Sequence, residues 1–431
     1  MLRIPPTVMK KFFFVLLATV LLPIGLSSCA SETPGNGSSE ATSSSSQTQE
    51  SGKSEGSDSS ASEAEGASTS QTSASKPSVN DFDPERAALL TDSSRLLAGL
   101  DVDENSPIAP LQDSGAWLDH ANFLNGAWST LESQQISRAR AWAAEELQPI
   151  NQTAPQIFYP FSGPDILYGY TFFPEATDYV MVGLEPVGDI PEITPDTNIG
   201  NRLQGVSQSL YAILQYSFFR TKDMAVDLSQ KGVSPILFVF LARTNNNILD
   251  AQYVGLDNNA QLQPMANRQE LIDSGLIPGV KISFVPEGES QPKTLYYFST
   301  DLSNTGLEKT PEFIEFVKTL NTPTTYLKAA SYLMHNESFS TIRNLILSQS
   351  SHVLQDDSGM PVRYFDPEQW DRQFYGAYVS PIELFAERYQ SDLRDIYQTD
   401  QNIKGLDFGI GYKFYNDSNL MLAKSKERAA N

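Results

Sequence analysis

The sequence predicts an α+β domain in which a largely antiparallel sheet has flanking helices and a helix-rich final third follows. Runs of aromatic and β-branched residues come together in the middle of the chain, and amphipathic helical stripes dominate after them. A strict alternation of strands and helices, typical of a doubly wound parallel sheet, is missing. We therefore expect an α+β domain over residues 81–320 and a helix-rich part over 321–431 that packs on it.

Seven segments predict strands because each is a short run rich in aromatic and β-branched side chains. They are residues 156–159, 166–173, 179–184, 235–243, 248–256, 280–285 and 295–299. Residues 174–178 are expected to be the turn of a hairpin between the second and third strands. Residues 287–292 are polar and predict the loop between the last two.

Helices are predicted where apolar residues recur at helical spacing behind a start signal. The first polar helix is expected at 84–100. Residues 129–132 have the spacing of a capping box and predict a second helix behind them. Further helices are expected at 202–219, after Thr310 with Pro311, after Ser338, and from the capping box with a proline at 380–383.

Residues 1–28 have the pattern of a secretory signal, with basic residues, an apolar run and small residues before Cys29. Cys29 is the only cysteine, and the preceding Leu26-Ser27-Ser28 with it resembles the lipobox of bacterial lipoproteins. The resemblance implies cleavage before Cys29 and lipid on its thiol, which makes the bilayer a partner. A signal cut elsewhere and an uncleaved anchor are the alternatives. The apolar run is short for a membrane span, and Pro23 interrupts it.

The segment after the lipobox predicts a flexible tether. Residues 29–80 are rich in serine and almost free of apolar side chains, so this linker is expected to be disordered. Ala30 after the cysteine resembles the signal for transfer to an outer membrane, in cells that have one. The predicted location is therefore extracytoplasmic and lipid-anchored.

Composition excludes several functional classes. The formal net charge is -22, which disfavours nucleic acid because phosphate binding needs clustered lysine and arginine. Cations, cationic partners or neutral glycans fit such a surface better. The lack of a cysteine after Cys29 excludes disulfides, thiolate catalysis and cysteine-bound zinc from the mature chain. No phosphate-loop, dinucleotide or haem motif occurs, so no cofactor is expected.

Three segments resemble a pattern found in uncharacterised bacterial exported proteins and lipoproteins. They are YPFSGPD at 159–165, GLEPVG at 183–188 and QDDSG at 355–359, the last followed by Pro361 and by RYF at 363–365. The resemblance covers most of residues 81–431. It implies no known activity and transfers no catalytic role to any residue.

The YPFSGPD segment leaves a predicted strand through a tight break. Such a loop can present Ser162 and Asp165 at a sheet edge, where functional residues are common. The alternative is a structural turn in which Asp165 caps the following segment. Ser162 does not lie in the Gly-x-Ser-x-Gly elbow of hydrolases, so nothing marks it as a nucleophile.

Asp356 and Asp357 are expected at the end of a helix. Two adjacent carboxylates can bind a cation, or one can act as a base whose pKa the other raises. Carboxylates at a helix C-terminus are unfavourable, and Arg363 is the nearest compensating charge. The alternative is an exposed turn with local hydrogen bonds. Neither aspartate has the spacing of a calcium loop.

The histidines give no metal pattern. His335 lies on a predicted apolar helix, where a satisfied core histidine is the simpler interpretation, and His352 follows the same logic. A Ser-His-Asp assembly from Ser162, one of these histidines and Asp356 is chemically conceivable. Nothing in the sequence brings the three residues together.

The leading functional hypothesis is a membrane-anchored extracytoplasmic lipoprotein with a ligand-binding or envelope-assembly role, because no catalytic motif stands out. Its partners beyond the bilayer would be a glycan or an envelope protein. The alternative is a carboxylate-dependent hydrolase of the cell envelope that uses Asp165, Asp356 and Asp357, with or without a divalent cation. It would gain if these residues and Arg363 converged in one cleft. A purely structural spacer is the third hypothesis.

Overall fold

The computed structural model describes residues 77–216, 232–414 and 417–430. Cys29, the signal segment and most of the Ser-rich linker lie outside the described residues. Residues 73–431 belong to one compact unit. Within the described ranges, no helix is both long and apolar enough to cross a membrane.

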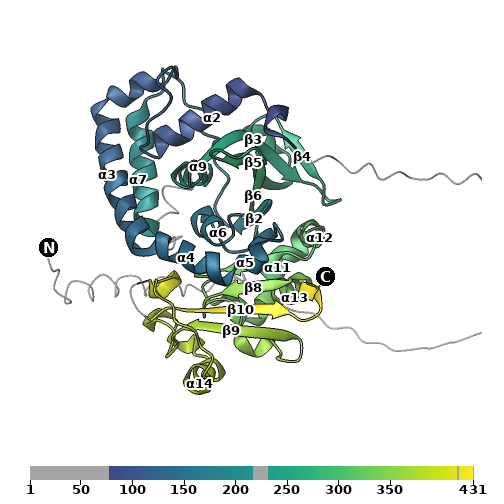
Figure 1. Ribbon diagram of the computed structural model, residues 1–431. Helices are drawn as coiled ribbons and strands as arrows, with labels where there is room; N and C mark the ends of the chain where they lie inside the picture. Colours follow the sequence, from purple (N-terminus) through teal and green to yellow (C-terminus); the bar gives the residue numbers. More distant parts are fainter. Residues whose placement is uncertain (1–76, 217–231, 415–416, 431) are drawn as a thin grey trace, which may run out of the picture. The chain divides into compact units, whose positions relative to one another are not determined.

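A single ten-stranded sheet runs through the described residues in the order β4-β3-β5-β6-β2-β1-β7-β8-β10-β9 (Figure 1). Its strands are β1 (Gln156–Tyr159), β2 (Asp178–Gly183), β3 (Asn246–Leu256), β4 (Leu262–Met265), β5 (Ile277–Pro286), β6 (Lys293–Ser299), β7 (Thr324–Leu327), β8 (His352–Gln355), β9 (Trp370–Gly376) and β10 (Asn419–Ser425).

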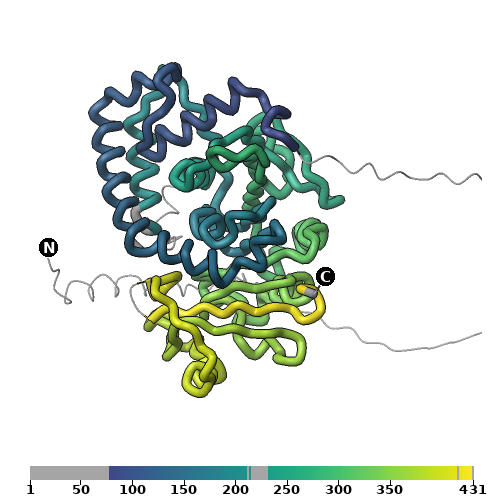
Figure 2. Tube along the Cα trace, in the orientation of Figure 1, coloured from purple at the N-terminus to yellow at the C-terminus, as the bar shows by residue number. Residues whose placement is uncertain are grey.

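Five of the nine strand pairings are antiparallel, which confirms an α+β fold with a largely antiparallel sheet. The four parallel pairings lie together in the centre and join β6, β2, β1, β7 and β8. Strands β3, β4 and β5 extend the sheet at one end. At the other end β10, the yellow strand of Figure 2, runs between β8 and β9.

Helices cover both faces of the sheet because successive strand residues alternate between two cores. Ile157 and Tyr159 of β1 belong to one core and Phe158 to the other. The first core is shared with α2 (Pro84–Leu97), α3 (Gly115–Leu131), α4 (Ser137–Glu146), α5 (Gln148–Asn151), α6 (Ile166–Phe172), α7 (Ile199–Tyr216) and α9 (Ser234–Arg243). The second is shared with α11 (Asn304–Lys309), α12 (Pro311–Lys318), α13 (Ser340–Gln349) and α14 (Ser391–Thr399).

Shorter helical pieces complete the described chain. Helix α10 (Arg268–Asp273) packs against β3 and β4. Single 3₁₀ turns occur at Val79–Asp81, Ala109–Asp113, Leu333–His335, Glu337–Phe339, Val362–Tyr364, Glu383–Arg388, Gly411–Lys413 and Arg428–Ala430.

Two predicted strands are helices. Residues 166–173 form α6 and residues 235–243 form α9, so the hairpin through 174–178 is also wrong. All but one residue of α6 and seven consecutive residues of α9 are buried. A helix that is apolar on every side has no helical period in its sequence, and a short one therefore looks like a buried strand. The other five predicted strands match β1, β2, β3, β5 and β6.

Some of the predicted helices are confirmed and others are wrong. Residues 84–100 and 202–219 correspond to α2 and to α7 as far as it is described, and Pro311 begins α12. Residues 129–132 do not start a helix, since α3 passes there through a π-helical turn (Glu132–Ile136) into α4. Residues 380–383 precede only a 3₁₀ segment, because Phe385 has non-helical dihedral angles.

The helix-rich final third is not found. Residues 321–431 supply strands β7 to β10, and β7 pairs directly with β1 from the middle of the chain. The two expected parts therefore share one sheet. The helix expected after Ser338 ends at Gln349, and residues 352–355 form β8.

Candidate functional site

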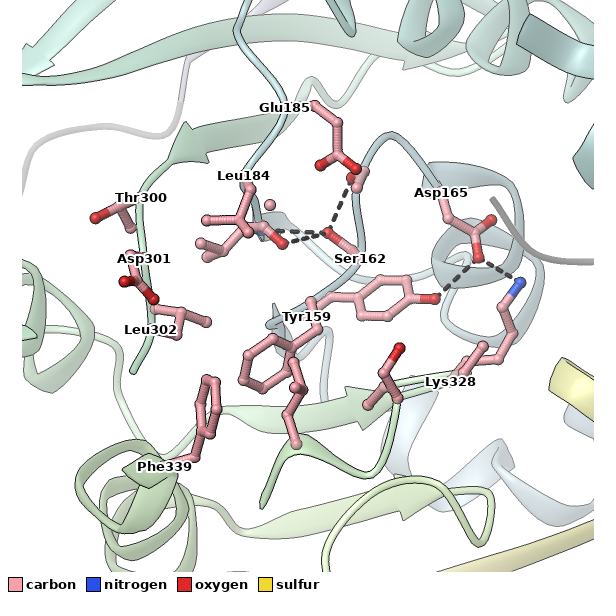
Figure 3. A pocket seen from close by; sticks show the side chains of 18 of the residues that line it. Tyr159, Ser162, Asp165, Leu184, Glu185, Thr300, Asp301, Leu302, Lys328 and Phe339 are labelled. Atoms are coloured by element: carbon pink, nitrogen blue, oxygen red, sulfur yellow. Dashed lines mark hydrogen bonds and ion pairs between the residues drawn. The ribbon is translucent and has the colours of Figure 1, made fainter. Parts of the chain in front are cut away.

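The loops that follow the five parallel strands gather at one edge of the sheet. Parallel strands end on the same side, and ligands of open sheets commonly bind outside these carboxyl ends. A cavity of about 240 Å³ lies there, and we term it the strand-end cavity (Figure 3). Its walls are Tyr159, Phe161, Ser162, Gly163, Asp165, Val182, Gly183, Leu184, Glu185, Thr300, Asp301, Leu302, Lys328, Ala329, Ala330, Ser331, Leu333, Phe339 and Tyr412.

The YPFSGPD loop turns sharply out of β1. Phe161 and Gly163 are both left-handed, with φ of 60° and 52°. The backbone N–H of Ser162 donates to the carbonyl of Val182 at 2.9 Å, and its hydroxyl donates to the carbonyls of Gly163 and Val182. None of the hydrogen bonds described for Ser162 involves a histidine or a carboxylate. Ser162 therefore ties the loop to β2.

Asp165 caps α6, as the structural alternative predicted, and it does more. Its Oδ1 accepts from the backbone N–H of Tyr168 at 3.3 Å, while Oδ2 accepts from the Tyr159 hydroxyl at 2.9 Å. Lys328 Nζ lies 2.5 Å from the same Oδ2 and 3.7 Å from the Tyr168 ring centroid. The two charged residues are 2% and 3% exposed, so this is a fully buried ion pair between the β1 and β7 loops.

The two pKa values show the cost of this burial. Desolvation raises the pKa of Asp165 and lowers the pKa of Lys328, and the attraction between the pair opposes both shifts. The Tyr159 hydroxyl, the Tyr168 N–H and the Tyr168 ring all favour the charged forms. The pair thus lines the cavity as a hydrogen-bonded ion pair with no net charge.

The loop after β7 has an unusual backbone. Ala329, Ser331 and Tyr332 are all left-handed, with φ of 51°, 53° and 54°. Each such conformation costs a non-glycine residue free energy, of order 1 kcal/mol or more, and persists only where the surroundings impose it. With Phe161, half of the eight described non-glycine residues with positive φ lie in the walls of the cavity or beside it.

The QDDSG loop after β8 holds the strained loop in place. Ala329 N–H donates to Asp356 Oδ2 at 3.0 Å, and Ala330 N–H donates to the Ser358 hydroxyl at 2.8 Å. The Tyr332 N–H donates to the Ser358 carbonyl at 3.0 Å. These bonds tie three backbone N–H groups of the β7 loop to the loop after β8, which explains how the strain is maintained.

Asp356 and Asp357 follow a strand and not a helix, and they are buried rather than on an exposed turn. Asp356 Oδ1 accepts from both the N–H and the hydroxyl of Ser358. Burial, and then repulsion by Asp357, raises the pKa of Asp356 to about 6. Asp357 accepts from the Tyr332 hydroxyl at 2.5 Å and from Asn419 Nδ2 at 2.9 Å.

These aspartates do not face the strand-end cavity. The void that touches both has a volume of about 10 Å³, which admits at most one water molecule. Asp165, Asp356 and Asp357 therefore lie at the ends of β1 and β8 on the same sheet edge, but only Asp165 lines the cavity. Among the described residues, no group of three or more acidic or histidine side chains could hold a metal ion.

Arg363 does not compensate the aspartate pair. It is exposed, its guanidinium lies 5.0 Å from the Tyr364 ring centroid, and no ion pair joins it to Asp356 or Asp357 within the described ranges. His335 makes a hydrogen bond with the backbone of Asp357, and burial lowers its pKa to about 4.

The assembly of Ser162, a histidine and Asp356 is not formed. Ser162 bonds to β2, and Asp356 bonds to Ser358 and Ala329. His352 opens β8, where its ring contacts the Ser351 hydroxyl at 3.2 Å and burial lowers its pKa to about 4.

Three charged residues of the cavity, Lys328, Glu185 and Asp301, were not predicted from the sequence. Lys328 follows a four-residue strand, and a lone lysine in that position has no distinguishing signal. Glu185 lies inside the GLEPVG segment, and its carboxylate rests above two glycines. A Cβ at Gly183 would stand 2.4 Å from Glu185 Oε2, and one at Gly163 would stand 3.6 Å from it.

Comparison of the chain with family models, with curated proteins and with solved structures found no match. The function therefore has to be inferred from the site itself.

Proposed function

We propose that this chain is an extracytoplasmic, lipid-anchored protein that binds a small ligand in the strand-end cavity. The observation that carries the proposal is the cavity itself, about 240 Å³ in volume at the carboxyl ends of parallel strands. This volume corresponds to roughly ten water molecules or to a ligand of the size of a sugar ring. The lipid anchor rests on the lipobox at Cys29 alone.

The composition of the walls supports a binding role. Apolar and aromatic side chains such as Phe161, Leu184 and Phe339 alternate with a few polar groups, as is usual for ligand sites. Leu184 is 67% exposed at the cavity and offers an apolar surface at its entrance. The strained backbone of the β7 loop is the kind of conformation that accumulates at functional sites.

The hydrolase alternative has no observation of its own to favour it. The oxygens of Asp356 and Asp357 accept hydrogen bonds from within the fold, and Asp165 is neutralised by Lys328. A general acid or base has to reach the substrate by hydrogen bonding. A binding role makes no such demand on these three residues.

Thermal melting with a variant that obstructs the cavity tests the proposal. A ligand that binds only the folded state raises the melting temperature. The fragment 73–431 should be melted with envelope glycans, small amines and divalent cations. Leu184→Trp places an indole at the entrance and should abolish any shift. Ile272→Trp changes a similarly exposed apolar residue on α10 and should keep the shift. Equal shifts in both variants would contradict binding in the cavity.

Anchoring needs a separate test. Metabolic labelling with a radioactive fatty acid should mark the full-length chain, and Cys29→Ser should lose both the label and sedimentation with membranes. A Cys29→Ser variant that still carries label would contradict the lipobox interpretation.

A further inference from the structure

We infer that the ligand of the strand-end cavity carries a protonated amine, and that Glu185 is the residue that accepts it. The inference rests on the proposed binding function and adds the chemical class of the ligand. Four charged side chains line the cavity: Asp165, Glu185, Asp301 and Lys328. Asp165 and Lys328 neutralise each other at 2.5 Å. Among the described residues neither Glu185 nor Asp301 has a cationic partner, so the free charge of the cavity is negative.

The chain makes room for the Glu185 carboxylate at the cavity wall. Gly183 and Gly163 lie beneath it, and a side chain at Gly183 would collide with Oε2 at 2.4 Å. The Tyr297 hydroxyl donates to the Glu185 carbonyl at 2.8 Å and lies 3.5 Å from Oε2, which fixes the residue from the other side. Figure 3 shows the carboxylate above Ser162, on the same side of the cavity as Leu184.

Asp301 is a secondary contributor. Its carboxylate accepts from the N–H of Ser303 at 2.8 Å and from the Ser303 hydroxyl at 2.9 Å, so it is held at the start of α11. It adds negative charge to the rim, but both of its carboxylate oxygens already accept hydrogen bonds from Ser303. Unlike a carboxylate on an open surface, Glu185 belongs to a concave site with apolar walls.

The remaining wall residues indicate which chemical groups the rest of the ligand should have. The rings of Phe161 and Phe339 lie 5.9 Å apart in an edge-to-face arrangement, and Leu302 is buried beside the cavity. These surfaces suit a ring face or a short apolar chain, and aromatic faces also attract a cation. A phosphate or carboxylate ligand would instead meet the charge of Glu185 and Asp301. The geometry points to a ring-sized amine, such as an amino sugar.

Matched pairs of probes separate charge from shape. Glucosamine and N-acetylglucosamine differ in whether the nitrogen is cationic, and cyclohexylamine and cyclohexanol make the same comparison without other hydroxyls. Ligand-observed NMR on the full-length protein in detergent suits weak binders. The amines should bind and the neutral partners should not. Glu185→Gln should weaken amine binding about tenfold or more, as expected for loss of a charge-assisted hydrogen bond. Glu315→Gln, an exposed residue on α12, should bind as the unaltered protein does.

Added salt should also weaken the binding of the amines, because Glu185 is only partly buried. Equal binding of amine and neutral probes that Leu184→Trp abolishes would overturn the amine assignment and leave the proposed function standing. Amine binding that Glu185→Gln leaves unchanged would overturn the role of Glu185. If no probe binds, the amine assignment fails, and the melting experiment with glycans decides separately whether the cavity binds anything.

Discussion

Replacing Lys328 by methionine should destabilise the protein strongly. Methionine preserves the length of the side chain but leaves the Asp165 carboxylate, 2% exposed, without its cation. Removing one partner of a buried ion pair typically costs about 3–5 kcal/mol, because the other charge remains desolvated. Asp165 retains the Tyr159 hydroxyl and the Tyr168 N–H, so we expect a loss near the lower end, about 3 kcal/mol.

The same variant should change its response to pH. Without Lys328, the raised pKa of Asp165 should rise further, so the folded state binds a proton more readily than the unfolded state, whose carboxyl has a pKa near 3.9. Folding then takes up a proton, and the free energy of unfolding increases as pH falls. The deficit of Lys328→Met should therefore be largest at about pH 7 and smaller at about pH 5. Urea unfolding at the two pH values measures both effects.

Two controls make this test specific. Lys318→Met removes an exposed pair with Glu315 and should cost about 1 kcal/mol or less. The double variant Asp165→Asn with Lys328→Met removes both charges and should recover much of the loss, since an uncharged amide is cheaper to bury. A cost for Lys328→Met as small as that of Lys318→Met, with no dependence on pH, would refute the description of a buried pair.

Three further perturbations have expected effects on stability or on ligand binding. His335 and His352 have pKa values lowered to about 4, so the unfolded state takes up protons at a higher pH than the folded state does. The free energy of unfolding should therefore fall between about pH 6.5 and pH 4, by at most about 3 kcal/mol for each histidine. The slope of urea midpoints against pH should flatten in His352→Gln, and an unchanged slope would contradict this. Gly411→Ala should cost about 2 kcal/mol or more in the same assay, because φ is 59° and the new Cβ would collide with Asp356 Oδ2; an equally stable variant would disprove that contact. Ser162→Ala should lower stability by about 1 kcal/mol yet leave ligand-induced melting shifts intact, whereas loss of those shifts alone would point to direct contact with the ligand.

Of the strands that supply the site, the sequence allowed β1, β2 and β6 to be located but not β7, and it did not locate the cavity. The predicted segment 156–159 coincides with β1, and residues 179–184 lie one position from β2. Both segments have side chains that alternate between two apolar cores and are bounded by turn residues, which makes them easy to recognise. Asp165 was also expected to cap the following segment, and it does so.

The failures have a common physical cause. Helices α6 and α9 are buried nearly all round, so their sequences lack the polar face that distinguishes a helix from a strand. Mistaking α6 for a strand removed an alternation of strand and helix, which concealed the parallel centre of the sheet. Without that centre, nothing predicted that Lys328 would meet Asp165, 163 positions earlier in the chain. Such contacts depend on strand order, which local patterns do not encode.

The most direct test of the account is a crystal structure of the protein with cyclohexylamine or glucosamine. We expect electron density for the probe inside the strand-end cavity, with its nitrogen within hydrogen-bond distance of the Glu185 carboxylate and its ring against Phe161 or Phe339. Density for the probe elsewhere on the surface, with only water in the cavity, would show that the loops after the parallel strands do not form the ligand site.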